Sequence, residues 1–180
     1  MRKVLFLFGE LRDHDVDWFA RTGRSLRLTP GMFLMHQNQK DEYLYIVLEG
    51  ELDISVNGIG KVAEIGSGEV VGEMSFVSDQ LPSADVIANS PCRVLAIPRE
   101  DLHAQIDEDA DFGLRFFRAL AVFLADRLRG TVQRLGRGAQ DNAEGEPLVH
   151  ELDGKLLDTV YVAGLRFERL IELVAAGRGG

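Results

Sequence analysis

The chain has 180 residues, of which 46% are hydrophobic, and its 20 basic and 29 acidic side chains give a net charge of −9. This length and composition suit one globular domain with some chain to spare and exclude an intrinsically disordered protein. The negative charge argues against a nucleic-acid partner, and the single cysteine excludes an intrachain disulfide, a four-thiolate zinc site and a four-cysteine iron–sulfur cluster.

The first residues do not resemble a targeting signal. The apolar run over residues 4–8 is too short for the core of a signal peptide and leads directly into Gly9 and Glu10. No apolar run in the chain reaches the length that a membrane-spanning helix needs. We therefore expect a cytoplasmic protein that does not contact a membrane.

Residues 28–97 are predicted to form short β-strands separated by glycines. Apolar and polar residues alternate over residues 52–56, and Asn57–Gly58 predicts a two-residue turn before the next run, residues 61–65. Further β-type runs are residues 44–48, 86–88 and 93–97. Many short strands at this spacing favour a β-sandwich or β-barrel over βαβ units.

A helical period replaces the β pattern after Pro98. A short helix carrying Leu102 and Ile106 is predicted first, and a long helix follows over residues 112–135. The residues of one helical face recur at three- and four-residue steps, and all but Thr131 are apolar: Phe117, Leu120, Leu124, Leu128, Thr131 and Leu135. Residues 136–150 are rich in glycine and polar side chains and are predicted to be a linker, and residues 151–177 are predicted to form a C-terminal amphipathic helix.

Basic residues are concentrated on the long helix. It carries six arginines between residues 112 and 137 but only one acid, Asp126. The six are Arg115, Arg118, Arg127, Arg129, Arg134 and Arg137. We favour a solvated face or a dimer seam for these arginines over an anion site.

Three segments of the β region carry a family resemblance: residues 29–35, residues 41–52 and residues 65–76, the last of which contains the pair Gly72–Glu73. Their turn glycines are spaced as in the cyclic-nucleotide-binding domain family, the sensor fold of the catabolite activator protein, kinase regulatory subunits and gated channels. The chain resembles that family over residues 5–135. The resemblance implies a mainly β fold, a jelly roll or double-stranded β-helix, with an N-terminal helix, a long C-terminal helix and an extra terminal helix.

This resemblance divides the chain into a cyclic-nucleotide-binding-like domain, residues 1–135, the linker, residues 136–150, and the terminal helix, residues 151–177. It also implies a ligand pocket closed by a short helix, the phosphate-binding cassette. In the family, the carboxylate matching Glu73 binds the ribose 2′-hydroxyl, and a downstream arginine binds the cyclic phosphate. The resemblance assigns the ligand-binding positions to Gly72, Glu73, Met74, Ser75, Pro82, Ser83 and Ala84.

The cassette departs from the family pattern at two positions. Pro82 stands in place of the phosphate-binding arginine, and Asp85 in place of a threonine. An arginine–phosphate fork supplies two charge-assisted hydrogen bonds of about 1.5–3 kcal/mol each, so its loss weakens binding by roughly two to four decades. Asp85 is expected to bring a further negative charge near the phosphate position. We therefore expect a site that is degenerate for cAMP and cGMP, and neither is expected as a cofactor.

Other functional classes are disfavoured. No helix-turn-helix follows the long helix, which again argues against a nucleic-acid partner. A metal-binding cupin needs a second histidine where Asn38 stands beside His36, and it needs a third histidine from a later strand, for which there is no candidate. We therefore expect no metal site and no catalytic residues, and the chain is not expected to be an enzyme.

Two hypotheses remain. The first is a non-enzymatic sensor that binds a small-molecule ligand and signals through its long helix. The second is a protein-interaction or dimerisation module with a vestigial pocket, and a true cyclic-nucleotide binder is less favoured than either. Retention of Gly72, Glu73 and Ser83 favours the first, whereas Pro82 and Asp85 favour the second. In both cases a homodimer through residues 112–135 is expected, with a seam formed by Phe117, Leu120, Leu124 and Leu128.

Overall fold

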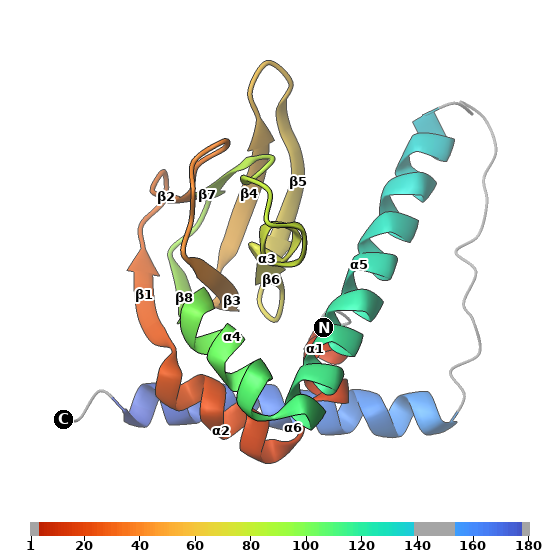
Figure 1. Cartoon of the computed structure of the whole chain (residues 1–180). Helices are drawn as coiled ribbons and strands as arrows, with labels where there is room; N and C mark the ends of the chain where they lie inside the picture. Colours follow the sequence, from red (N-terminus) through yellow and green to blue (C-terminus); the bar gives the residue numbers. More distant parts are fainter. Residues whose placement is uncertain (1–3, 139–153, 178–180) are drawn as a thin grey trace.

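A computed structural model describes residues 4–138 and 154–177 (Figure 1). Within these residues, eight strands form two antiparallel four-stranded sheets, in the orders β1-β8-β3-β6 and β2-β7-β4-β5. The predicted jelly roll is therefore confirmed. The elements in chain order are α1 Val4–Glu10, α2 Asp13–Thr22, β1 Arg24–Leu28, β2 Phe33–Met35, β3 Tyr43–Glu49, β4 Glu51–Val56, β5 Gly60–Gly66, β6 Val70–Val71, α3 Glu73–Ser78, β7 Asp85–Ala88, β8 Cys92–Pro98, α4 Arg99–Glu108, α5 Ala110–Gly138 and α6 Gly154–Ala176.

The sheet that contains β3 and β8 separates two apolar cores. Alternate residues of these strands point to opposite faces, so Tyr45 and Val47 enter a core between the two sheets while Leu44 and Ile46 enter a core against the helices. We call these the barrel core and the helical core. Because both faces are covered, all five residues from Leu44 to Leu48 are buried. This explains the continuous apolar run in the sequence.

The hairpin between β4 and β5 has a longer turn than expected. Val56 pairs with Gly60, which leaves three residues in the loop instead of two. Gly58 and Gly60 both have positive φ angles, 81° and 89°, which side chains with a Cβ rarely adopt. The second glycine allows the chain to turn one residue later than the Asn57–Gly58 signal indicated.

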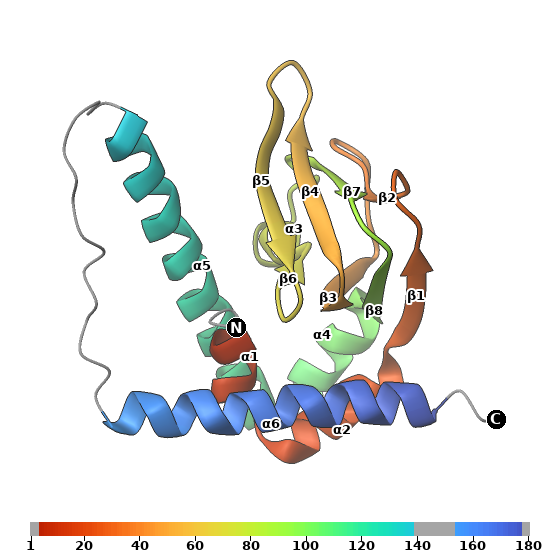
Figure 2. The same cartoon turned by 180° about the vertical axis from the view of Figure 1, so that it is seen from behind.

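The N-terminal part of the chain forms two helices where one was expected. The apolar run that is too short for a signal peptide lies in α1, whose Leu7 and Phe8 are buried in the helical core. Figure 2 shows α6 crossing the base of the molecule beside α1 and α2, and the rings of Phe8 and Phe167 lie 5.4 Å apart. The amphipathic stripe of α6 therefore covers the N-terminal helices.

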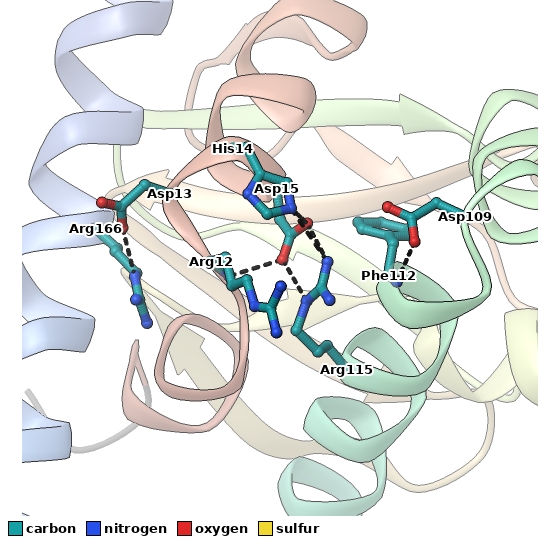
Figure 3. A network of polar contacts seen from close by, with 8 residues as sticks. All are labelled: Arg12, Asp13, His14, Asp15, Asp109, Phe112, Arg115 and Arg166. Atoms are coloured by element: carbon teal, nitrogen blue, oxygen red, sulfur yellow. Dashed lines mark hydrogen bonds and ion pairs between the residues drawn. The ribbon is translucent and has the colours of Figure 1, made fainter.

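Ion pairs fix the helices to one another at the base. Asp15 of α2 is buried and accepts two hydrogen bonds of 2.8 Å from Arg115 of α5 and one of 2.7 Å from the backbone N–H of Arg12 (Figure 3). Burial alone would raise the pKa of Asp15, but these hydrogen bonds outweigh it and lower the pKa. On the other side, Arg166 of α6 pairs with Asp13 at 2.9 Å.

The long helix α5 begins at a side-chain cap and continues past the expected boundary. The Asp109 carboxylate accepts the backbone N–H of Phe112 at 2.9 Å, which satisfies a helix-start donor. The helix extends to Gly138, and the rest of the expected linker, residues 139–150, lies outside the described residues. Leu120 is buried in the helical core, so it cannot belong to an exposed dimer seam. No helix of the described ranges is both long and apolar enough to span a membrane.

Candidate ligand-binding site

The cassette helix α3 begins at a glycine that the local geometry requires. Gly72 has a φ of 87°, and a Cβ there would lie 3.1 Å from the carbonyl oxygen of Tyr43. Arg99, at the start of α4, donates to the carbonyl oxygens of Tyr43 and Gly72 at 3.3 Å each. The first turn of α3 is thereby held against β3 and α4.

Glu73, the first residue of α3, pairs with an arginine of the long helix. Only 2% of its surface is exposed, and its Oε1 accepts a hydrogen bond from Nη1 of Arg127 on α5. Burial raises the pKa of Glu73, and the Arg127 guanidinium opposes this shift. The guanidinium also lies 5.0 Å from the centroid of the Phe123 ring, within the range of a cation–π contact.

Arg127 is the site residue that the sequence interpretation missed. The sequence pattern favours a solvated face or a dimer seam for all six arginines of α5, but the side chain of Arg127 reaches the cassette and is 30% exposed. The available signal was its spacing: Arg127 stands four residues after Phe123, so both side chains lie on the same face of α5.

The seven expected ligand positions lie around one small cavity. This cassette cavity has a volume of about 70 Å³, and Arg127 forms part of its wall. Its remaining walls are apolar side chains of the barrel, Met35, Ile54, Val71 and Val86. The structure thus brings together Gly72, Glu73, Met74, Ser75, Pro82, Ser83 and Ala84.

Asp85 lies elsewhere than the expectation placed it. Its neighbours Val86 and Ala88 are buried in the barrel core, so the alternation of β7 turns Asp85 outward. Its carboxylate accepts the backbone N–H of Gln37 at 2.7 Å and lies 3.8 Å from Nδ1 of His36. The expected negative charge beside the phosphate position is therefore absent from the wall of the cassette cavity.

A larger cavity adjoins the cassette cavity between α5 and the β4–β5 hairpin. We call it the helix groove; its volume is about 490 Å³, and it shares Ile54, Met74 and Arg127 with the cassette cavity. Its other wall residues are Ala63, Glu64, Ile65, Glu69, Phe123, Leu124, Asp126, Leu128, Gly130 and Thr131. This volume is within the usual range of small-molecule sites.

The described residues contain no group of three or more histidine, cysteine or acidic side chains placed to hold a metal ion. His36, the residue considered for a cupin-like metal site, stacks on Phe33 with ring centroids 4.5 Å apart. His36 therefore lies between Phe33 and Asp85 on the outside of the barrel.

Comparison with known proteins agrees with this architecture. A family model described as the cyclic nucleotide-binding domain matches residues 25–109. Residues 25–109 therefore form a domain of the cyclic-nucleotide-binding family. A cyclic nucleotide-binding domain from Methylobacillus flagellatus has a similar structure, with a TM-score of 0.68, 19% identity, and coverage of 78% of this chain and 84% of that one.

One solved structure and one curated relative extend the comparison. The catabolite activator protein of Thermus thermophilus has a TM-score of 0.61 and 23% identity, with coverage of 96% of this chain and 87% of that one. A cGMP-dependent protein kinase of Eimeria tenella is 26% identical over 104 residues, 58% of this chain and 10% of the kinase. The chain matches a tenth or less of the length of the curated relatives reported for it, so the activities of those whole proteins are not transferred to it. The cyclic-nucleotide-binding domain itself supports a regulatory sensor module.

Proposed function

We propose that the chain is a non-enzymatic, ligand-sensing module of the cyclic-nucleotide-binding fold that does not respond to cAMP or cGMP and signals through α5. The ion pair between Glu73 and Arg127 carries this proposal. It joins the cassette, where a ligand would bind, directly to the long helix.

The ion pair gives a physical route from ligand to helix. A ligand that approaches Glu73 competes with Arg127 or adds to its contacts, and either event changes the free energy that holds α5 against the cassette. A ligand shifts a conformational equilibrium only by its difference in affinity for the two states. Contact with Glu73 provides such a difference in affinity, because Glu73 is paired with Arg127 in one state and with the ligand in the other. Among the described residues, Arg127 is the only basic side chain in the wall of either cavity.

The same geometry argues against a cyclic phosphate. Pro82 has no N–H to donate, and its carbonyl oxygen accepts the backbone N–H of Asn38 at 2.8 Å. Arg127, the one cation that the described part of the chain places in the cavity walls, is already paired with Glu73. Although Asp85 points away, the cassette still lacks the fork that would bind the phosphate.

A dimerisation module is the second candidate, and exposed apolar side chains on α5 favour it. Leu114, Phe117, Leu128 and Val132 are 71%, 42%, 65% and 58% exposed. We propose that this stripe, without the buried Leu120, forms the contact of a homodimer. A monomeric mass from light scattering at micromolar concentration would contradict it.

Titration of the full chain with cAMP and cGMP, followed by calorimetry and by backbone amide NMR, tests the sensor proposal. We expect neither nucleotide to bind with a Kd below about 100 µM, since the lost fork costs roughly two decades or more. Low-micromolar binding of either would overturn the degenerate cassette. The variant Pro82→Arg supplies the missing guanidinium and is the positive control for both nucleotides.

A further inference from the structure

The walls of the two adjoining cavities carry an excess of negative charge. Among the described residues, the cassette cavity and the helix groove are lined by four carboxylates but by a single guanidinium, that of Arg127. The carboxylates are Glu64, Glu69, Glu73 and Asp126. Carboxylates thus outnumber basic side chains in these walls, although a structurally similar domain is named for an anionic nucleotide.

Neighbouring groups reduce this excess only in part. Lys61, outside the cavity wall, pairs with Glu64 at 2.7 Å and shares its charge with Asp53, also at 2.7 Å. Glu69 accepts the backbone N–H of Gly66 at 2.6 Å. Even with Lys61 counted, carboxylates outnumber basic side chains among the described residues in and beside these walls. An anionic ligand is therefore repelled there and a cationic one attracted.

The remaining walls of the helix groove suit an apolar ligand body. Ile54, Ile65, Met74, Phe123 and Leu124 line it together with Ala63 and Leu128. Apolar walls with a few charged groups are the usual composition of a small-molecule site, in which the charged groups fix the orientation of the ligand. The groove therefore fits a molecule that combines an apolar body with a positive charge.

We propose that the ligand of this site is a small organic amine whose ammonium group competes with Arg127 for Glu73. The inference rests on the proposed ligand-sensing function and names its ligand class. Glu73 is buried and needs a cation beside it, so exchange of a guanidinium for an ammonium keeps its charge compensated. The exchange frees Arg127 and breaks the link between the cassette and α5.

Three indole compounds of nearly equal size but different charge test this proposal. Tryptamine carries an ammonium group, tryptophol a hydroxyl group and indole-3-acetate a carboxylate. In backbone amide NMR of the full chain, tryptamine is expected to shift resonances of α3 and of α5 near Arg127. Its affinity is expected to be at least tenfold higher than that of tryptophol, and indole-3-acetate is expected to bind weakest. Added KCl should weaken tryptamine binding but not tryptophol binding.

Variants separate the roles of the two charged partners. Glu73→Gln should remove the preference for tryptamine over tryptophol. Arg127→Gln should strengthen tryptamine binding several-fold, because the internal competitor is gone. Glu100→Gln, an equal change of charge at an exposed position of α4, is the matched control and should leave all three affinities unchanged. The salt dependence of the unmodified chain keeps the test decisive even if a variant does not fold.

The negative results have different meanings. If indole-3-acetate shifts the α3 and α5 resonances at lower concentration than tryptamine does, the cationic ligand class is wrong while the proposed ligand-sensing function survives. If cAMP or cGMP does so, the cationic ligand class is wrong and the degenerate cassette of the proposed function is overturned as well. If none of the five compounds shifts these resonances at concentrations up to about 1 mM, where even a ligand bound by only about 4 kcal/mol would be detected, both proposals are overturned.

Discussion

Replacement of Arg127 by glutamine should destabilise the fold in a way that depends on pH. The change leaves Glu73, 2% exposed, without a cationic partner. Removal of one partner of a fully buried ion pair costs about 3–5 kcal/mol. Because the Arg127 side chain is 30% exposed and glutamine can still donate a hydrogen bond, we expect a smaller loss, about 2 kcal/mol at pH 8.

The pH dependence follows from the direction of the pKa shift. Burial already raises the pKa of Glu73, and loss of Arg127 raises this pKa further. A carboxyl whose pKa is higher in the folded state binds its proton more tightly there, so the folded state is favoured at low pH and loses this advantage as pH rises through the folded pKa. The deficit of Arg127→Gln should therefore be largest at pH 8 and should shrink toward pH 5.

Urea unfolding at both pH values measures this effect. A loss of about 2 kcal/mol corresponds to a midpoint lower by roughly 1 M for a typical slope of about 2 kcal/mol per M. Arg129→Gln, an exposed arginine on the same helix, is the control and should change stability by less than about 0.5 kcal/mol. In the background of Glu73→Gln, the Arg127 deficit should lose its pH dependence. An equal deficit at pH 5 and pH 8 would show that the ion pair is not its source.

Three further predictions concern the rest of the fold and can be checked by the same urea titrations. Asp15→Asn leaves Arg115 without its carboxylate partner and should cost about 3 kcal/mol of unfolding free energy at pH 7. Because the folded pKa of Asp15 is lowered, the stability that this ion pair contributes is present above pH of about 4 and is lost as pH falls through the folded pKa. A deficit that does not shrink in acid would refute this reasoning. Phe167→Ala should cost about 3 kcal/mol by opening a hole beside α1, and a loss under about 1 kcal/mol would mean that α6 contributes little. Gly50→Ala should lower the free energy of unfolding clearly more than Gly58→Ala does. Both glycines have positive φ angles, but only at Gly50 would the new Cβ lie 2.5 Å from the Pro91 carbonyl oxygen. Equal losses of stability in the two variants would contradict this steric argument.

The barrel and its cassette could be predicted because local patterns determine them. The run from Leu44 to Leu48 and the glycine at position 72 each report a local requirement: burial on both faces of a strand and a positive φ angle. The outward direction of Asp85 could also be predicted from local pattern, since Asp85 alternates with the buried Val86 along β7.

The contact between Arg127 and Glu73 could not be predicted in the same way. The two residues stand 54 positions apart, and the sequence does not show at which angle α5 passes the cassette. The amphipathic stripe of α6 likewise predicted a covered face but did not say that α1 and α2 cover it. Both facts depend on how elements pack against one another, which a periodicity does not encode.

The helical core also implies an order of folding. The buried residues of the barrel core all lie between Leu28 and Ala96, whereas the base of the molecule joins Arg166 to the carbonyl oxygen of Phe8 across 158 positions of sequence. During synthesis the barrel core can therefore assemble early, while the face of α1 and α2 stays uncovered until α6 has emerged. Unfolding in the native state is expected to follow the reverse order, so that α6 detaches while the barrel and its cassette remain intact.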